Sequence, residues 1–154
     1  MTTKRKPPRH VEDDHQRALV QWASHRLLRP APDVEPGATL GDYLYAVPNG
    51  GNRGRIEAAR LKGLGVKAGV SDLKLPLARG GYAGLYLEMK KPRSAFRSPR
   101  EAERAISDSQ AEWRDRMIRA GYRWAIAYGW DEAREILTDY LAQPRTTLAT
   151  ESTA

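Results

Sequence analysis

The sequence contains no cysteine and only three histidines among its 154 residues. Without cysteine, disulfides, thiolate nucleophiles and thiolate-bound metals are excluded. The histidines (His10, His15 and His25) have none of the spacings that zinc sites use, and they give a serine triad little support. A metal site in this chain would therefore be built from oxygen ligands, which bind hard cations such as Mg²⁺ or Mn²⁺.

Long apolar runs are also missing. No stretch approaches the roughly 18–20 apolar residues that a membrane-spanning helix needs. The N-terminal segment MTTKRKPPRH is basic and lacks the apolar core of a signal peptide. We therefore expect a cytoplasmic protein without membrane association.

Positive charge is abundant. Lys and Arg number 26 against 19 Asp and Glu, which gives a net charge of +7. This balance suits an anionic partner, and nucleic acid is the commonest one, although a basic surface can also serve solubility alone. The chain is 40% hydrophobic and 29% charged, as in an ordinary globular protein, and its length predicts one domain.

Hydrophobic periodicity predicts an α/β domain with its elements in the order α-β-α-β-β-α-β-α. Residues 1–10 are expected to be a disordered basic arm and residues 143–154 a disordered tail, which leaves 11–142 as the domain. The expected helices span 11–28, 55–65, 107–121 and 130–142, the last of them capped at Asp131, and the expected strands span 42–48, 69–78, 83–90 and 122–128.

The segment AGLYLEMKK (83–91) places charged residues inside a core strand. Because side chains alternate along a strand, its leucines and Met89 point to one face, while Tyr86, Glu88 and Lys90 point to the other. Burying both charges without partners would be costly, so this second face must be open to solvent, paired or metal-bound. On an edge strand the same Glu-x-Lys pattern is usually a solvated face.

Asp72 is a second acid of this kind, because it interrupts the apolar segment GVSDLKL. If the strands at 72–77 and 84–90 pair through the RGGY turn, Asp72 and Glu88 lie near the same end of a hairpin. Two carboxylates that converge there make a site for a hard cation. Lys90 beside them could orient a water molecule or stabilise charge on a phosphate oxygen.

The succession of Asp72 and Glu88-Met89-Lys90 resembles the active site of the PD-(D/E)XK nuclease superfamily. Within it, the chain is similar to the VRR-NUC family, especially the small stand-alone proteins of phages. The matching pieces, which span about residues 11–141, include AVPNGGNR, AARLKGLGVKAGVSDLKLP, RGGYAGLYLEMK, SQAEW and AGYRWAIAYGWDEA. The resemblance implies a single restriction-endonuclease-like domain, in which helices flank a mixed sheet. It also implies metal-dependent hydrolysis of phosphodiester bonds in DNA.

The resemblance also implies roles for individual residues. Asp72 and Glu88 correspond to the family's metal-binding acids, with the main-chain carbonyl of Met89 as a further ligand of Mg²⁺ or Mn²⁺. Lys90 corresponds to the catalytic lysine. Glu12 matches a helical acid that completes the metal site.

Gln110 occupies the position of the family's glutamine on the helix that follows the core strands. Two of these roles have structural alternatives. Gln110 forms a capping box with Ser107, and Glu12, which has acidic neighbours, could simply favour the N-terminus of its helix. One departure from the family pattern is Ser71, which stands where a proline usually precedes the aspartate and shapes the strand.

Basic residues are expected to contact DNA at two places. The glycine-rich turn PNGGNRGR precedes a helix and could hold phosphate on its backbone N–H groups, although NGG is foremost a turn signal. The connection 91–106 looks longer than the family's usual link and forms either a DNA-contacting flap or a solvated loop. The expected DNA contacts are Arg53, Arg55, Lys62, Lys91, Arg93 and Arg97.

By this resemblance we expect a structure-specific endonuclease for branched DNA such as Holliday junctions, located in the host cytoplasm if the chain is phage-encoded. A homodimer is expected because a four-way junction requires two symmetric nicks. The alternatives are a nuclease for nicked, flap or RNA substrates and a basic nucleic-acid-binding module that does not cut. Acids that face a phosphate argue against the binding module, because they repel DNA unless a cation intervenes.

Overall fold

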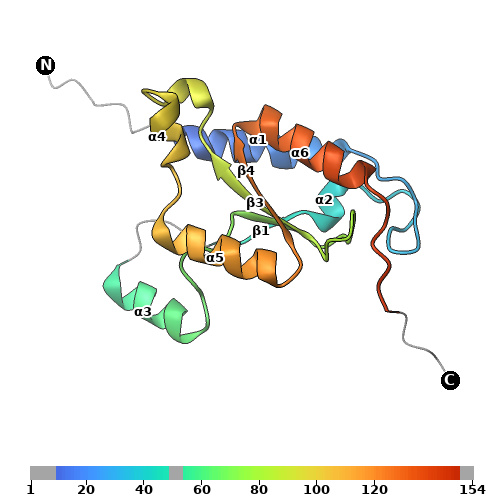
Figure 1. Cartoon of the computed structure of the whole chain (residues 1–154), viewed down its shortest axis with the longest axis horizontal. Coiled ribbons are helices and arrows are strands. Elements are labelled where there is room, and N and C mark those ends of the chain that lie inside the picture. The colour runs from blue at the N-terminus through green and yellow to red at the C-terminus, as the bar shows by residue number, and fades with distance from the viewer. Residues whose placement is uncertain (1–9, 49–53, 150–154) are drawn as a thin grey trace, which may run out of the picture.

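A computed structural model describes residues 10–48 and 54–149, so the expected basic arm lies almost entirely outside the described residues. The strands form one mixed sheet in the order β1-β2-β3-β4 (Figure 1). They are β1 (Tyr45–Ala46), β2 (Leu73–Leu75), β3 (Leu85–Lys90) and β4 (Arg123–Tyr128). The first three are antiparallel neighbours, whereas β4 runs parallel to β3. The predicted α/β class, a mixed sheet flanked by helices, is confirmed.

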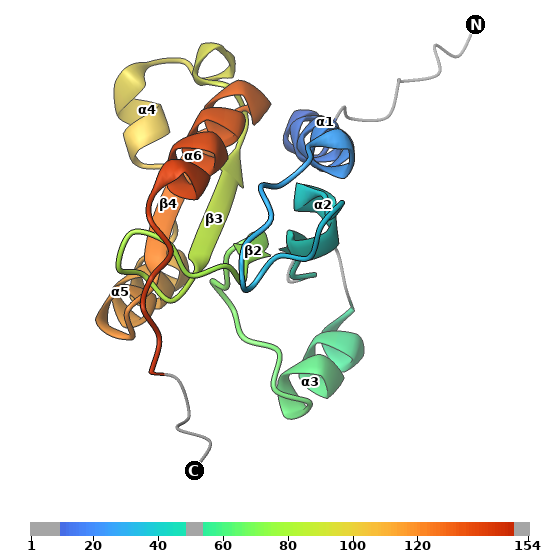
Figure 2. The same cartoon turned by 90° about the vertical axis from the view of Figure 1, so that its right-hand side faces the viewer.

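Helices flank both faces of this sheet. They are α1 (Val11–His25), α2 (Leu40–Tyr43), α3 (Arg55–Gly63), the short 3₁₀ helix η1 (Arg93–Ala95), α4 (Pro99–Glu103), α5 (Asp108–Arg119) and α6 (Trp130–Ala142). α1 and α6 lie side by side on one face, and α5 lies on the other (Figures 1 and 2). None of the helices in the described part has the length and apolar character that crossing a bilayer requires.

The hydrophobic core lies between the sheet and the pair α1 and α6. Leu85, Leu87 and Met89 of β3 point into it, and Leu19 of α1 and Leu137 of α6 close it from the other side. Full burial of one such side chain contributes about 1.5–3 kcal/mol. The apolar face of β3 is therefore held inward, and its polar face must point to the side that carries α5.

Two expected elements differ from their sequence patterns. The expected strand 42–48 is reduced to β1, because Thr39 and Asp42 form a capping box that begins the short helix α2. α3 forms where a helix was expected, but Ile56 is 89% exposed and Leu64 is 70% exposed. Its apolar residues do not pack against the body, from which α3 projects (Figure 2).

The connection between β3 and α5 carries the two short helical segments η1 and α4. Ser98 caps α4 by accepting a hydrogen bond from the backbone N–H of Glu101. The hydroxyl of Tyr128 donates to the carbonyl of Ala102 at 2.8 Å, which ties α4 to the end of β4. These contacts place the connection over the carboxyl ends of β3 and β4.

The last helix, α6, follows β4 and begins at Trp130. The predicted cap at Asp131 is therefore wrong, because Asp131 lies in the first turn of this helix.

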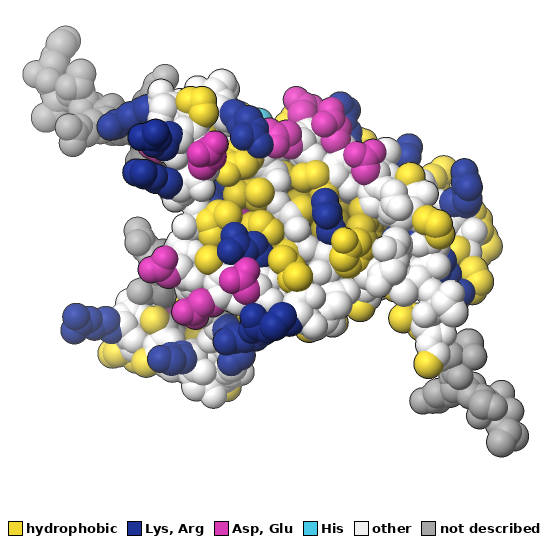
Figure 3. All heavy atoms as spheres, in the orientation of Figure 1, with side chains coloured by type: hydrophobic (Ala, Val, Ile, Leu, Met, Phe, Trp, Pro, Cys, Tyr) yellow, Lys and Arg dark blue, Asp and Glu magenta, His cyan; other side chains and the backbone are white. Residues whose placement is uncertain are grey.

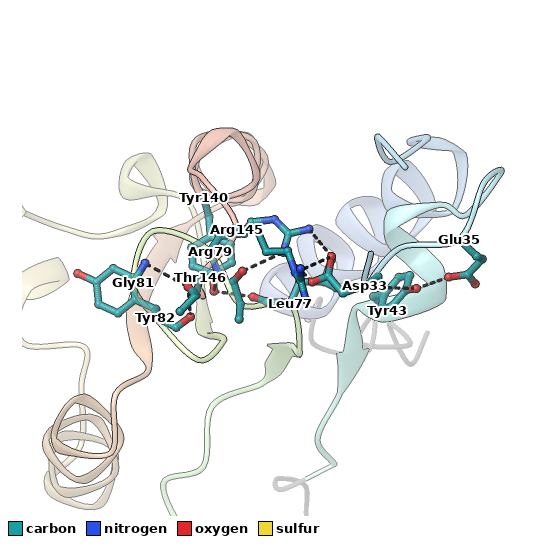
Figure 4. A network of polar contacts seen from close by, with 11 residues as sticks. Asp33, Glu35, Tyr43, Leu77, Arg79, Gly81, Tyr82, Tyr140, Arg145 and Thr146 are labelled. Carbon is teal, nitrogen blue, oxygen red and sulfur yellow. Dashed lines mark hydrogen bonds and ion pairs between the residues drawn. The ribbon is translucent and has the colours of Figure 1, made fainter. Parts of the chain in front are cut away.

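The tail predicted from residue 143 is wrong for its first residues, because the chain after α6 continues along the 78–82 turn (Figure 4). The N–H of Thr146 donates to the carbonyl of Ala78, and its hydroxyl donates to the carbonyl of Tyr82 at 2.7 Å. The same hydroxyl accepts from the N–H of Gly81. These hydrogen bonds make this stretch part of the fold.

Arg79 is a buried cation at the start of the same turn, and Asp33 neutralises it (Figure 4). The guanidinium donates two hydrogen bonds to this carboxylate, at 2.8 and 3.2 Å. These hydrogen bonds hold the pKa of Asp33 below its usual range. Tyr140 of α6 accepts from the backbone N–H of Arg79 and donates to the carbonyl of Leu77, which joins the turn to α6.

Candidate active site

Glu88 lies on the polar face of β3 and is only 2% exposed. Its Oε1 accepts a hydrogen bond from Nε2 of Gln110 at 2.6 Å and lies 3.6 Å from Nζ of Lys90. Its other oxygen, Oε2, is buried and has no hydrogen-bond partner among the described residues. The side chains of Glu88 and Asp72 also interact directly. Because a buried pair of carboxylates that lacks a donor for one oxygen is costly when both are ionised, this place suits a proton or a cation.

Asp72 approaches the same place from the residue just before β2. The register pairs Leu73 with Leu87, so Asp72 stands opposite Glu88 across the hairpin. Its Oδ2 accepts the N–H of Met89 at 2.7 Å. The N–H and C=O of one strand residue point to the same side, so the carbonyl of Met89 also faces Asp72. The structure thus brings the two strand acids and this carbonyl together.

The surroundings of these acids disfavour negative charge. Burial raises the pKa of Glu88 to about 8; the charge of Asp72 adds to the effect, and the charge of Lys90 opposes it. Burial also raises the pKa of Asp72 and that of Glu12 above their ordinary values. A bound cation would remove this penalty, so the electrostatics of the site fit a divalent metal.

Glu12 reaches the open side of the site from the first turn of α1. Its charge interacts with those of Lys90 and Asp72, and it accepts a backbone hydrogen bond from Lys91. Within the described residues, no three acid or histidine side chains converge closely enough to hold a metal by themselves. The residues that the structure brings together to hold a cation are therefore Asp72, Glu88 and the carbonyl of Met89. Glu12 lies close enough to interact with their charges but is not placed as a third acidic ligand.

Gln110 serves its helix and the site together. Its Oε1 accepts from the N–H of Ser107 at 2.9 Å, which completes the capping box of α5. The same oxygen accepts from Nζ of Lys90 at 3.3 Å, while Nε2 donates to Glu88. The two interpretations of Gln110 are therefore compatible, because one amide caps α5 and ties the lysine to the buried acid.

The expected DNA contacts fall into two groups. Arg55 and Lys62 are exposed on α3, and Arg97 is exposed beside α4, whereas Arg53 lies outside the described residues. Figure 3 shows Lys and Arg side chains over α3 and over the α4 connection, on either side of a hollow. The end of β3 that carries the acids lies between these two groups (Figure 1).

Two of the residues expected to contact DNA already interact with other residues of the protein. Arg93 forms an ion pair with Glu132 at 2.9 Å, and its guanidinium stacks 4.1 Å from the ring centroid of Tyr128. Nζ of Lys91 lies 4.5 Å from the ring centroid of Phe96. The charge of Arg93 is therefore largely compensated by α6, whereas Lys91 lies beside an aromatic ring.

His15 is a supporting residue that sequence reasoning missed. Its Nδ1 accepts the N–H of Trp130 at 3.0 Å, which fastens α1 to the start of α6. Since Glu12 precedes His15 by one helical turn, this contact helps to set where Glu12 enters the site. A lone histidine on an amphipathic helix carries no sequence signal for such a role.

The raised pKa of Glu88 predicts an unusual pH dependence for the metal-free protein. The folded state holds this proton more tightly than the unfolded state, so the stabilisation is complete below pH 4.5 and is lost as the pH rises to about 8. We expect the melting temperature in EDTA to fall on the order of 10 °C across this interval. Calorimetry in EDTA measures this fall in the melting temperature, and the same scans in Mg²⁺ provide the comparison with metal present. A melting temperature in EDTA that rises between pH 4.5 and 8 would contradict the prediction.

Comparison with known proteins supports a nuclease fold. The chain is similar to a solved structure described as a VRR_NUC domain protein, with a TM-score of 0.68 and 27% sequence identity. The match covers 92% of this chain and 96% of that one. No family model and no curated protein matches the sequence. The four-stranded sheet and its flanking helices are thus consistent with a single VRR-NUC nuclease-like domain.

Proposed function

We propose that this protein is a metal-dependent nuclease of the PD-(D/E)XK superfamily that hydrolyses phosphodiester bonds in DNA. The observation that carries the proposal is the convergence of Asp72, Glu88 and Lys90 on one face at the end of β3. The unsatisfied oxygen of Glu88 and the likeness to a VRR_NUC domain protein support it. The net charge of +7 suits a polyanionic substrate.

The cation of this proposal is Mg²⁺ or Mn²⁺, held by Asp72, Glu88 and the carbonyl of Met89, with the charge of Glu12 nearby. Carboxylate and carbonyl oxygens are the ligands that these ions prefer. When bound, such an ion stabilises charge on the phosphate and on the leaving oxygen, and it acidifies a water molecule. The ion also compensates the acids that burial and mutual repulsion now disfavour.

Lys90 is the proposed catalytic residue that orients the attacking water and supports its deprotonation. The water gives up a proton to solvent as its oxygen forms a bond to phosphorus, the bond from phosphorus to the leaving oxygen breaks, and the leaving oxygen takes up a proton from solvent. A one-step attack of this kind inverts the configuration at phosphorus, which a chiral substrate would reveal. Gln110 is a positioning residue, because its amide holds both Lys90 and Glu88.

The proposed substrate is branched DNA such as a four-way junction, cut by a homodimer. Stand-alone VRR-NUC proteins resemble junction resolvases, and a two-fold dimer would supply the two symmetric nicks. The basic groups on α3 and beside α4 would bind the phosphates of the arms. A phage origin and a place in the cytoplasm of its host belong to the same proposal.

Replacing Lys90 tests the site directly. We expect Lys90→Ala to slow cleavage of a labelled four-way junction by about 10²–10⁴-fold, because the variant loses the group that assists proton transfer. The wild type should make paired, symmetric nicks in Mg²⁺ or Mn²⁺ and none in EDTA, with less cutting of a linear duplex. Arg134→Ala, which removes an exposed cation from α6, is the matched control and should cut at the wild-type rate.

Each other outcome rejects one part of the proposal. If the protein cut the junction and the linear duplex equally fast, it would be a nuclease without the proposed preference for branched DNA. Cutting that survives Lys90→Ala would place the active site elsewhere. If the protein binds DNA equally well with and without metal and never cuts it, it is the basic binding module.

A further inference from the structure

A row of aromatic and basic side chains crosses the sheet beside the acids. Tyr45 pairs with Lys74, Lys74 with Tyr86, and Tyr86 with Trp124. Because directly paired residues share a face, all four lie on one face of the sheet. Glu88 follows Tyr86 by two residues on that face, so the row runs about 7 Å along the strands from the acids.

α5 covers one end of this row and leaves the other end open. Trp113 of α5 packs edge-on against Tyr86, with ring centroids 5.6 Å apart, and α5 contacts β4. β1 and β2 lie beyond α5 (Figures 1 and 2), and Tyr45 on the edge strand is 48% exposed.

Lys74 stands over aromatic rings rather than against an acid. Its Nζ lies 4.9 Å from the ring centroid of Tyr86 and 5.0 Å from that of Tyr122. Its side chain also interacts with the hydroxyl of Tyr86, and no carboxylate in the described part of the chain forms an ion pair with it. A partly exposed ammonium without a carboxylate partner is suited to bind a phosphate.

We propose that Tyr45 and Lys74 receive an unpaired nucleotide next to the scissile phosphate, with its base on the tyrosine ring and its phosphate at the ammonium. The inference rests on the proposed nuclease function and narrows the substrate to branched DNA with an unpaired nucleotide beside the cut, as at a flap or at a junction whose central base pairs have opened. A paired base inside a duplex has both faces covered by its neighbours. An unpaired base has a free face, which can stack on the ring of an exposed tyrosine.

The test compares two duplexes that differ only by one unpaired nucleotide beside the cleavage site. We expect Tyr45→Ser to slow cutting of the unpaired substrate at subsaturating DNA by roughly 5- to 150-fold, the range that loss of one base stack gives. The loss on the fully paired duplex should be much smaller, and Tyr45→Phe should restore the wild-type ratio. Tyr82→Ser removes an exposed tyrosine from the 78–82 turn and should change neither rate.

A second readout does not depend on cleavage. With 2-aminopurine as the unpaired base, binding of the full-length Lys90→Ala protein in Mg²⁺, which cuts too slowly to interfere, should quench fluorescence, and adding Tyr45→Ser should abolish that quenching. Quenching that persists in Tyr45→Ser, or equal rate losses on both duplexes, would overturn the inference while leaving the nuclease function intact. Failure of the wild type to cut either DNA in Mg²⁺ or Mn²⁺ would instead reject the nuclease function.

Discussion

Glu88→Gln should abolish cleavage and, at the same time, raise the melting temperature of the metal-free protein. The amide cannot supply the negative charge that a divalent cation needs from this position. We expect cleavage to fall by at least about 10³-fold, which corresponds to several kcal/mol of lost transition-state stabilisation. Rates of junction cleavage in Mg²⁺ measure this loss.

The stabilising half of this prediction follows from the raised pKa of Glu88. At pH 8 the wild-type carboxyl is partly ionised in a buried place beside Asp72, whereas an amide is neutral at every pH. The hydrogen bond from Gln110 can remain, because the amide oxygen still accepts. In EDTA the variant should therefore melt higher than the wild type at pH 8, and the two curves should converge near pH 5.

Glu112→Gln is the matched control for this variant. Glu112 is exposed on α5, so its neutralisation should leave both the cleavage rate and the pH dependence of melting unchanged. If Glu88→Gln melted lower than the wild type at pH 8 in EDTA, the charge of Glu88 would be stabilising in the apo protein. The electrostatic argument for a cation site would then be wrong.

Gly69→Ala should be the most destabilising small substitution in the loop before β2. Gly69 has φ +82°, a conformation that costs other residues about 1–2 kcal/mol. A Cβ there would lie 2.1 Å from the carbonyl oxygen of Ser109 and 2.8 Å from the nitrogen of Gln110. These are backbone atoms of the first turn of α5, so the clash cannot be relieved without moving the helix.

The total loss from Gly69→Ala should exceed about 4 kcal/mol, as measured by urea denaturation. Gly65→Ala isolates the cause, because Gly65 also has a positive φ (+96°) but no atom lies within 4 Å of its added Cβ. Gly65→Ala should therefore lose only the stability that the positive φ costs a residue other than glycine, about 1–2 kcal/mol. The folded fraction of Gly69→Ala should also cut more slowly, because Gln110 would shift. Equal losses in the two variants would show that the contact with α5 carries no stability.

Much of the site could be predicted because its pattern is local. The alternation in β3 separates the core residues Leu85, Leu87 and Met89 from the polar face, and the structure has this separation. Asp72 was expected near Glu88 because a short turn joins their strands, and the register places them opposite each other. Such features depend on side-chain period and turn length, which can be read along a single segment.

Other features depend on segments that are distant in the chain. Gln110 lies 22 residues from Glu88, and sequence pattern alone could not show that its capping amide also reaches the acid and Lys90. The exposure of α3 was missed for the opposite reason, since apolar spacing predicts a helix without showing whether anything covers it. The packing of Thr146 against the 78–82 turn likewise has no local signal.

The sequence by itself determined the α/β class, the two faces of β3, the cap of α5 and the acids and lysine that define a candidate nuclease site. Only the tertiary structure showed how these groups act on one another. It buries Glu88 beside Asp72, which raises the pKa of Glu88, and it places Tyr45 and Lys74 in one row beside the acids. The physical reason is that periodicity is a property of one segment, whereas burial, charge interaction and strand register arise only when separate segments pack together.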